Sequence, residues 1–489
     1  MPGVVVTTAV RTGPTNTQVT PTATLFVAGV TTRGPEGKAV AVTSIADYEA
    51  IYGGPTTSGW VHQTLTSFFE EGGARAYVSR VVVDSAVAAT LDLDDSSGDP
   101  AITLTASGEG TWANGGNLQA AVSYIGDNFR IAISFNGEVV YTTASHAKSE
   151  TGASSAVDEL NGNATAGLYV TAALGVGTFP AVVSASSFTG GVDSTSNELV
   201  DDSDLAEALA FFIDSYGPGA VCAPGFYSSD NYDKLIAHAV AYGRIAILGF
   251  DRDDSASSVA ADAASYADVA GAEYAAFYYP WVKVPNGNLT SVIPCEGYVA
   301  AKRAKVQNES GPWSAYAGAA SQATFVTAPY VVLSSANENS LVNAAVNPIK
   351  LVNGTTRIYG ARSVSSDVAN FRFITGRETV NYIVYQARTG LEALVFQPID
   401  GRRALFARIA STLVAIMERI RIGGGVYEAI DATGQLVDPG YSVVVNDSLN
   451  PVSQLASGTI KAKIGARISS IGETIEIEIV KSNLTASLV

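Results

Sequence analysis

The most regular alternation of apolar and polar side chains is a run of isoleucines and glutamates near the C-terminal end. The isoleucines are Ile475, Ile477 and Ile479, and the glutamates between them are Glu476 and Glu478. Because successive side chains of a strand point to opposite faces, the two residue types occupy different faces of a half-buried strand. Such a strand either completes a sheet of its own domain or pairs with the exposed edge of a neighbouring molecule.

A second β-like run lies at the other end of the sequence. Val4, Val5 and Val6 follow a Pro-Gly turn dipeptide, and a polar, threonine-rich stretch separates them from the next apolar run. We expect residues 1–22 to form an extended arm.

The next part of the chain mixes strand-like and helix-like patterns. The runs 24–30 and 76–83 are apolar enough to be buried strands. Between them, Ser44 is expected to cap one helix, and a second helix is expected from about Trp60 to Glu71. Strand, helices and strand in this order are typical of an α/β domain.

Residues 87–194 have a different character, with short alternating strands and an Asn136-Gly137 hairpin signal. We interpret them as a β-rich outer domain inserted into the α/β domain. The α/β alternation then resumes, so residues 23–86 and 195–345 together are expected to form one middle domain with a parallel or mixed sheet.

The last third contains the most clearly amphipathic helix, predicted over residues 400–421. Strands are expected near 357–361 and 371–376, and a further helix over 380–389. The apolar residues of the long helix recur at steps of four, four, three and four: Leu405, Ile409, Leu413, Ile416 and Ile420.

These patterns predict a multidomain protein of the α+β and α/β classes. Mixed-sheet domains carry covering helices, a β-rich domain is inserted, and extended β arms lie at both ends. We expect residues 346–470 to form an α+β C-terminal domain and residues 471–489 a strand arm.

Charge changes this picture in one respect. The net charge of −17 excludes nucleic acid as the main partner, because binding to phosphates needs clustered Lys and Arg. The charge is uneven, since residues 346–489 carry a net +3 and residues 1–345 a net −20. Only 15% of residues are charged, and such a neutral surface suits packing against other subunits.

Because the last third of the chain is basic, four arginines of the long helix are candidate binding residues. Arg402 and Arg403 open the helix, and Arg408 and Arg419 are eleven residues apart on one face. The face is either a docking surface for an acidic partner or simply solvated, and the pattern alone leaves both readings open.

Candidate chemistry is sparse. His62, His146 and His238 fall in different predicted elements without ligand spacing, so no metal, cofactor or catalytic site is predicted. Cys222 and Cys295 are expected to be buried thiols rather than a disulfide. No signal peptide and no apolar run long enough for a membrane span are recognised.

Three loops imitate ligand sites but have a simpler interpretation. Residues 92–99 resemble a calcium loop with its glycine misplaced and are expected to be an acidic turn. Residues 108–116 are interpreted as a loop around a packed Trp rather than a phosphate cradle. Residues 251–254 could hold a cation, but acidic capping of the following helix is favoured.

Short motifs occur in a fixed order along nearly the whole chain. They are Pro2-Gly3-Val4, Phe26-Val27-Ala28-Gly29 with Gly34-Pro35, Tyr52-Gly53-Gly54, the run from Phe68 to Val81, Gly110-Thr111-Trp112-Ala113-Asn114, Ala223-Pro224-Gly225, Tyr278-Tyr279-Pro280-Trp281, Asn347-Pro348-Ile349, Tyr359-Gly360-Ala361-Arg362 and Gly440-Tyr441. Together with the final Glu-Ile run, this order resembles the contractile tail sheath proteins of bacteriophages, tailocins and contractile injection particles. The loop 311–318 departs from the family, which often reads Trp-Lys-Ala-Pro-Ala there.

The resemblance implies a structural subunit without enzymatic activity or cofactor. Such a subunit polymerises helically, as hexameric rings stacked around an inner tail tube, and contracts to drive the tube through a target envelope, as in genome ejection by a virion. Its partners are further copies of itself, the inner tube protein, and baseplate and tail terminator proteins. No nucleic acid is bound directly and no membrane is entered. The particle is assembled in the cytoplasm of the bacterial host.

The resemblance also assigns roles to the candidate residues. The N- and C-terminal strands link neighbouring subunits, which assigns this role to Val4, Val5, Val6 and the run from Ile475 to Ile479. The C-terminal domain faces the inner tube, which assigns tube contact to Arg402, Arg403, Arg408 and Arg419, and the inserted domain lies outward. Two alternatives stay open, a secreted surface-layer or adhesin-type assembly protein and a polysaccharide-active enzyme.

Overall fold

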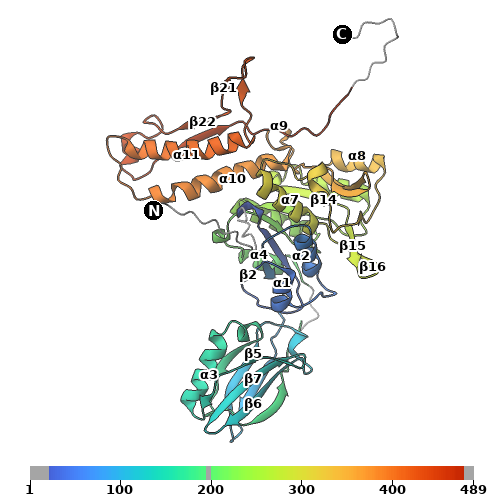
Figure 1. The fold of residues 1–489 in the computed structure, drawn as a ribbon, viewed down its shortest axis with the longest axis vertical. Coiled ribbons are helices and arrows are strands. Elements are labelled where there is room, and N and C mark those ends of the chain that lie inside the picture. Colours follow the sequence, from blue (N-terminus) through green and yellow to red (C-terminus); the bar gives the residue numbers. More distant parts are fainter. Residues whose placement is uncertain (1–20, 194–199, 478–489) are drawn as a thin grey trace, which may run out of the picture.

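The computed structural model describes residues 21–193 and 200–477 of the chain (Figure 1). The molecule is elongated, and three bodies follow one another along its longest axis. A sheet with covering helices lies in the middle, a β-rich body lies at one end, and a layer of long helices lies at the other. The predicted mixture of α/β and α+β structure is confirmed.

The central sheet has eight strands in the order β19-β18-β14-β13-β12-β1-β3-β2. Neighbouring strands from β18 to β3 run parallel, and β19 and β2 are antiparallel at the two edges. The strands are β1 (Leu25–Gly29), β2 (Ala39–Val42), β3 (Ala76–Arg80), β12 (Ala220–Cys222), β13 (Ile245–Leu248), β14 (Ala275–Tyr279), β18 (Val346–Val352) and β19 (Thr355–Ile358).

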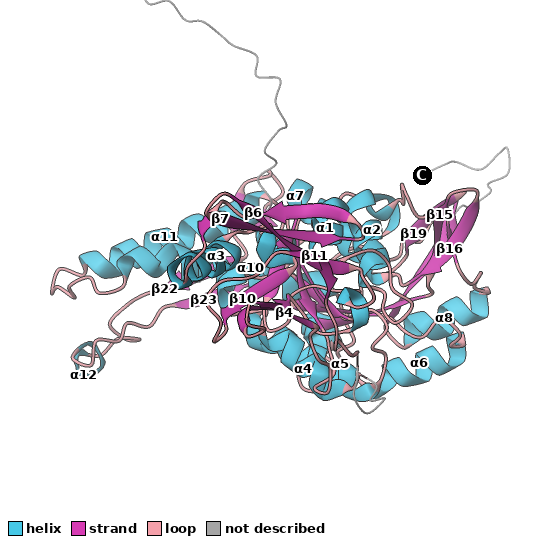
Figure 2. Ribbon diagram, turned by 90° about the horizontal axis from the view of Figure 1, so that it is seen from below, coloured by secondary structure: helices cyan, strands magenta, loops and turns pink. Residues whose placement is uncertain are grey.

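Helices cover both faces of this sheet, as Figure 2 shows. One face carries α1 (Ile45–Tyr52), α2 (Val61–Glu70) and α7 (Glu296–Ser310), and the other carries α4 (Asp202–Ala210), α5 (Ser229–Tyr242), α6 (Ala256–Ser265) and α8 (Ser335–Asn343). Leu25 and Val27 of β1 belong to the first core, and Phe26 and Ala28 to the second. Burial on both faces explains why β1 is a continuous apolar run.

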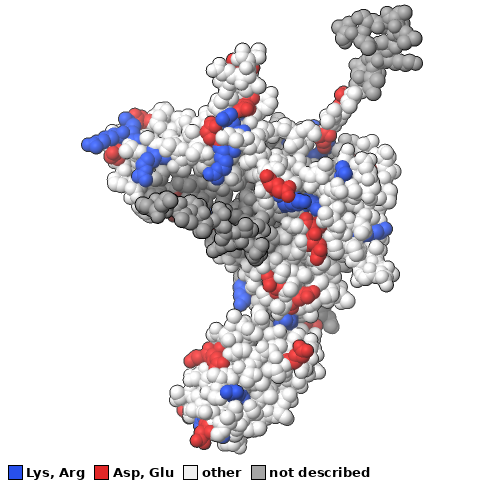
Figure 3. All heavy atoms as spheres, viewed as in Figure 1, with Lys and Arg blue, Asp and Glu red and all other residues white. Residues whose placement is uncertain are grey.

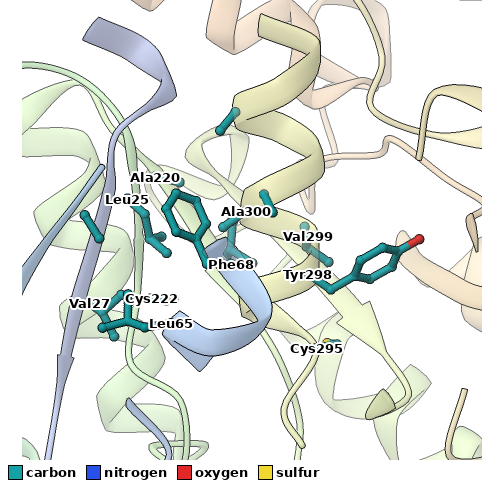
Figure 4. Packing of buried hydrophobic residues seen from close by; sticks show 14 of the residues in the cluster. Leu25, Val27, Leu65, Phe68, Ala220, Cys222, Cys295, Tyr298, Val299 and Ala300 are labelled. Atoms are coloured by element: carbon teal, nitrogen blue, oxygen red, sulfur yellow. The ribbon is translucent and has the colours of Figure 1, made fainter. Parts of the chain in front are cut away.

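The first strands and helices form as their sequences predict. The Ser44 hydroxyl accepts a hydrogen bond from the Asp47 amide at the start of α1. In the core between β1, α2 and α7, Leu65 and Phe68 of α2 pack beside α7 (Figure 4). Gly297 is required at this crossing, because a Cβ there would overlap the backbone of Thr64.

Helix α7 buries charged side chains that bond to distant parts of the chain. Lys302 Nζ lies 2.5 Å from the Glu71 carboxylate, and both side chains are at most 1% exposed. The same carboxylate accepts hydrogen bonds from the amides of Thr324, Phe325 and Val326, at 2.7 to 3.1 Å. Full hydrogen bonding makes the buried charge tolerable.

A second buried pair joins α7 to the next layer. Arg303 Nε donates to Glu378 Oε1 at 2.6 Å, and Gln307 Nε2 donates to the other carboxylate oxygen at 2.9 Å. The Arg303 guanidinium also donates to the Thr22 carbonyl oxygen at 2.7 Å. Glu378 belongs to α10 (Ile374–Leu391), so this network ties the central body to the long helices.

The inserted domain (residues 87–193) has its own hydrophobic core. Its strands are β4 (Thr90–Asp94), β5 (Pro100–Ala106), β6 (Leu118–Ile125), β7 (Asn128–Phe135), β8 (Glu138–Thr142), β9 (His146–Ala147), β10 (Val170–Leu174) and β11 (Val183–Ser187). It also contains a helix that its sequence pattern did not reveal, α3 (Glu150–Gly162), which Ser149 caps.

Arg33 fastens the inserted domain to the central body. Its guanidinium carbon lies 4.8 Å from the ring centre of Tyr169, 5.0 Å from that of Phe135 and 5.8 Å from that of Trp112. It also donates to the Leu168 carbonyl oxygen at 3.3 Å. Cation–π contact is strongest where water is excluded, and Arg33 is only 4% exposed.

The C-terminal layer consists of α10, α11 (Ala404–Ile422) and small strands. Helices α10 and α11 lie side by side, and the two-stranded sheet of β22 (Tyr441–Val444) and β23 (Lys463–Ala466) packs on them. A hairpin of β20 (Ala429–Ile430) and β21 (Leu436–Asp438) projects from the layer (Figure 1). A short helix, α12 (Val452–Leu455), lies between β22 and β23.

The predicted strand over residues 371–376 is wrong. The Asp367 carboxylate accepts the Asn370 amide and starts a short helix, α9 (Val368–Phe371), and α10 begins at Ile374. The alternating phenylalanines imitate a strand, but the capping carboxylate upstream decides the conformation. The long helix also begins four residues later than predicted.

Trp313 fills the joint between the central body and the C-terminal layer. Its indole ring packs edge to face on Tyr382 of α10, with ring centres 6.1 Å apart. Three glycines surround the ring, Gly311 after α7 and Gly423 and Gly425 after α11, and a Cβ at any of them would overlap the indole. The ring therefore occupies a socket that larger residues would close.

A small sheet of β15 (Val282–Asn286), β16 (Leu289–Ile293) and β17 (Ala328–Pro329) completes the central body. Among the helices that the structure describes, none has the length and apolarity needed to cross a membrane.

The buried pair of Lys302 and Glu71 leads to a first prediction. Replacing Lys302 by Met leaves the carboxylate buried with its amide donors but without a counter-charge. We expect the free energy of unfolding to fall by about 3 kcal/mol. Chemical denaturation measures this, and Lys305→Met, an exposed position on the same helix, is the matched control with little expected change. Equal losses in both variants would contradict the prediction.

Glu296, the first residue of α7, gives a prediction about pH. Burial raises the pKa of its carboxyl from 4.5 to about 7, and Tyr227 donates to it at 2.9 Å. Since the folded state holds this proton more tightly than the unfolded state, stability falls as pH rises from about 4.5 to about 7. We expect Glu296→Gln to raise the unfolding free energy at pH 8 by up to about 3 kcal/mol and to change it little at pH 4. A gain of equal size at both pH values would refute this.

Candidate functional site

The segment 471–477 completes no sheet of its own chain. After β23, the last backbone hydrogen bond to the body runs from the Ser469 amide to the Gly425 carbonyl oxygen. Residues 471–477 then leave the body (Figure 1), and Ile475 and Ile477 are 85% and 79% exposed. Of the two roles that the alternation allowed, closing a sheet of the same domain is not seen in this described part.

Other predicted arm residues lie outside the described residues. These are Val4, Val5, Val6, Glu478 and Ile479. Glu476 is described and exposed.

Glu473 holds this C-terminal segment to the central body. Its carboxylate lies 2.7 and 2.8 Å from Nε and Nη2 of Arg362, a bidentate arrangement, and 3.2 Å from Arg372 Nη2. The Arg362 guanidinium keeps the pKa of the Glu473 carboxyl below its ordinary value. Bidentate pairs fix direction as well as distance, so this contact sets where the segment leaves the body.

The sheet of β22 and β23 has unpaired edges. Only these two strands pair in it, with Val443 opposite Ile464, and both side chains pack against the helices. No third strand joins them within the described chain. A two-stranded sheet that is covered on one face is a ready acceptor for an added strand.

The four predicted arginines differ in how free they are. Arg403 is bound to Asp447 at 2.5 Å. Arg402, Arg408 and Arg419 are exposed and form no ion pair with a described residue. Figure 3 shows Lys and Arg atoms along the α10 and α11 side of the molecule. The structure therefore leaves three of the four available for a partner.

The buried stripe of α11 agrees with the prediction except at one position. Leu405, Ile409, Leu413 and Ile420 are buried. Met417 is buried in place of Ile416, which is only partly buried. Arg408 and Arg419 lie outside this stripe, as predicted.

A cavity of about 710 Å³ lies between the central body and the inserted domain. It lies where β1, β3 and β12 end. Among its lining residues that are described, Asp193 is the one carboxylate, and the Thr111 amide and hydroxyl occupy its oxygens. A glycosidase needs two carboxylates across the substrate, so this cavity does not support the polysaccharide-enzyme alternative.

The imitated ligand sites have structural explanations. The Asp95 carboxylate accepts hydrogen bonds from the amides of Ser97, Asp99 and Thr178, so residues 95–99 form a closed turn at the end of β4. In the glycine-rich loop, Trp112 is 92% buried and donates to a backbone carbonyl.

The acidic run 251–254 forms a turn before α6, and the residue that caps this helix is Ser255 rather than an aspartate. The prediction that an acidic residue of 251–254 caps this helix is therefore wrong, because Ser255 is the cap.

The histidines and cysteines also have structural roles. His62 and His146 each bond a glutamate, Glu49 and Glu159, while His238 contacts Arg244. Cys222 and Cys295 are buried free thiols, as expected. Among the described residues, no group of three His, Cys, Asp or Glu side chains could hold a metal ion.

Sequence reasoning missed the pairing of Arg362 with Glu473. Arg362 ends the Tyr-Gly-Ala-Arg motif and Glu473 lies just before the final Glu-Ile run, but the two residues are 111 positions apart. A single sequence does not say which of many opposite charges meet.

Searches of family models and of curated proteins find no match to this chain. Solved structures do match. The sheath of an extracellular contractile injection system in its contracted state (PVC) has 14% sequence identity and a TM-score of 0.58, over 99% of this chain and 98% of that chain. The contracted helical sheath of the anti-feeding prophage has 14% identity and a TM-score of 0.55, over 98% and 100%.

A crystal structure of a sheath tail protein from Listeria innocua is also similar. It has 12% identity and a TM-score of 0.59, over 87% of this chain and 89% of that chain. The match includes the central body, the inserted domain and the C-terminal layer, since almost the full length is covered in two of the three comparisons. The resemblance noted in the sequence is thus confirmed in three dimensions, and this chain has the fold of the contractile sheath proteins.

Proposed function

We propose that this chain is the subunit of a contractile sheath, which polymerises helically around an inner tube and contracts to drive the tube through a target envelope. The observation that carries the proposal is the likeness over 99% of the chain to a sheath subunit solved in its contracted state. The subunit performs no catalysis. Heterologous contacts that do not close on themselves build helical arrays of this kind.

Contraction in this proposal needs no nucleotide. The extended array is held kinetically, and the contracted array buries more surface between subunits, so energy is stored at assembly. The neutral, small-residue surface that the composition predicts suits repeated sliding contacts between copies.

Strand addition links the subunits. The exposed Ile475 and Ile477 of one copy pair with the open edge of the β22 and β23 sheet of another copy, together with the N-terminal run Val4 to Val6. Backbone ladders on extended arms persist while the bodies move. The glutamates of the arm limit wrong strand pairing before assembly.

The C-terminal layer faces the inner tube and the inserted domain faces outward. Support comes from the arginines of α11, which give the layer a basic surface in an acidic protein. Further partners are baseplate and terminator proteins. The particle is a phage tail or a related injection particle, and it assembles in the bacterial cytoplasm. Electron microscopy of the purified protein tests the proposal, and a protein that stays monomeric under all assembly conditions would contradict it.

Removal of residues 471–489 tests the arm. We expect a folded protein that no longer forms tubes, because the body keeps all its cores while the linking strand is lost. Circular dichroism checks folding and negative-stain microscopy checks assembly. Tubes of normal length from the shortened chain would eliminate this role.

Charge reversal on α11 tests the tube contact. We expect Arg408→Glu combined with Arg419→Glu to weaken co-assembly with the inner tube by about tenfold or more, because two attractive contacts become repulsive. Co-sedimentation with purified tube protein measures it. Arg130→Glu in the inserted domain, an exposed arginine, is the control for charge and should leave binding unchanged. Unaltered binding of the double variant would show that this face does not meet the tube.

A further inference from the structure

The carboxylate of Glu473 secures the C-terminal segment to the body through ion pairs with Arg362 and Arg372. Among residues 470–477, Glu473 alone forms hydrogen bonds to the rest of the described chain. The residues that follow it are exposed, including Ile475 and Ile477. The position of these isoleucines therefore depends on a contact two residues upstream.

The receiving side of this contact is rigidly built. The Asn347 side chain, fully buried, accepts the Arg362 amide at 2.7 Å and donates to the carbonyl oxygens of Arg362 at 2.9 Å and Phe277 at 3.1 Å. The Arg362 guanidinium also donates to the Val342 carbonyl oxygen. The backbone and the guanidinium of Arg362 are thus held by contacts that do not involve Glu473.

Two separate motifs of the sequence meet in this arrangement. Asn347 begins the Asn-Pro-Ile motif in β18, and Arg362 ends the Tyr-Gly-Ala-Arg motif after β19. Gly360, two residues before Arg362, lies against Asn347, because a Cβ there would come within 2.6 Å of the Asn347 side-chain oxygen. Gly360, Asn347 and Arg362, which come from two separate motifs, therefore pack together at one place.

We propose that Asn347 and Arg362 form an anchor for the C-terminal segment, which binds Glu473 and so directs Ile475 and Ile477 toward the sheet edge of a neighbouring copy. Glu473 is a positioning residue in this inference. The pairing with a neighbouring copy rests on the proposed function, whereas the anchor is formed by contacts within a single chain.

An anchor at Glu473 limits the positions that Ile475 and Ile477 can reach. A strand advances about 3.3 Å per residue, so Ile477 stays within about 14 Å of Glu473. A segment that is held at its root samples fewer positions and loses less entropy when it pairs. Without the root contact, the segment would be free from about residue 470.

Spin-label distances test the anchor in the single chain. Labels are placed at Ile477→Cys and at Ala336→Cys on α8, and the native thiols stay unlabelled because both are buried. We expect Glu473→Gln to widen the distance distribution about twofold. Glu476→Gln removes the same charge from the same segment, has no ion pair with a described residue, and should leave the distribution unchanged. An unchanged distribution in Glu473→Gln overturns the anchor.

Tube formation by the Glu473→Gln chain, without labels, tests whether the anchor contributes to assembly. We expect Glu473→Gln to need about three- to tenfold more protein than the unaltered chain to form tubes, the effect of one partly exposed charged pair. Glu138→Gln, which removes the same charge from an exposed position of the inserted domain, should need the same concentration as the unaltered chain. A wider distance distribution with an unchanged assembly threshold overturns the role in assembly. Failure of the unaltered chain to form tubes contradicts the proposed function and leaves the spin-label result standing.

Discussion

The buried charges of α7 hold the molecule together. Lys302 binds Glu71 at the end of α2, and Arg303 binds Glu378 in α10, so two adjacent residues of one helix connect the central body with the C-terminal layer. Charges in a protein interior are stable only when every polar atom around them is placed correctly. The loop 324–326, whose amides complete the shell of Glu71, therefore has its position fixed by the same requirement. Such contacts specify one arrangement of the layers, where apolar packing alone would tolerate several.

The same helix shows why sequence reasoning was incomplete. The runs that became β1 and β3, the cap at Ser44 and the stripe of α11 were predictable, because each depends on neighbours in sequence. Helix α7 was not recognised, since its glutamates, lysines and arginine obscure any apolar stripe. Lys302 and Arg303 are buried against partners that lie 231 and 75 residues away. Periodicity treats a charged residue as exposed, and here tertiary pairing reverses that rule.

The candidate site divides in a similar way. The exposure of Arg408 and Arg419 followed from the helix period alone. The commitment of Arg403 to Asp447 and the binding of Glu473 by Arg362 did not, because both depend on where separate loops come together. The strand predicted at residues 371–376 failed for a local reason, a capping aspartate just upstream. The exposure of a side chain along one helix can thus be predicted from the sequence, whereas its ion-pair partner can be identified only from the folded structure.

The glycine socket of Trp313 has a mechanical meaning. The indole ring lies against Gly311, Gly423 and Gly425, so a tilt of the long helices against the central body would have to displace it. The joint is stiff, and the neighbouring network of Arg303 and Glu378 resists shear across it. We expect a force on the C-terminal layer to reach the central body through the indole ring and this ion pair.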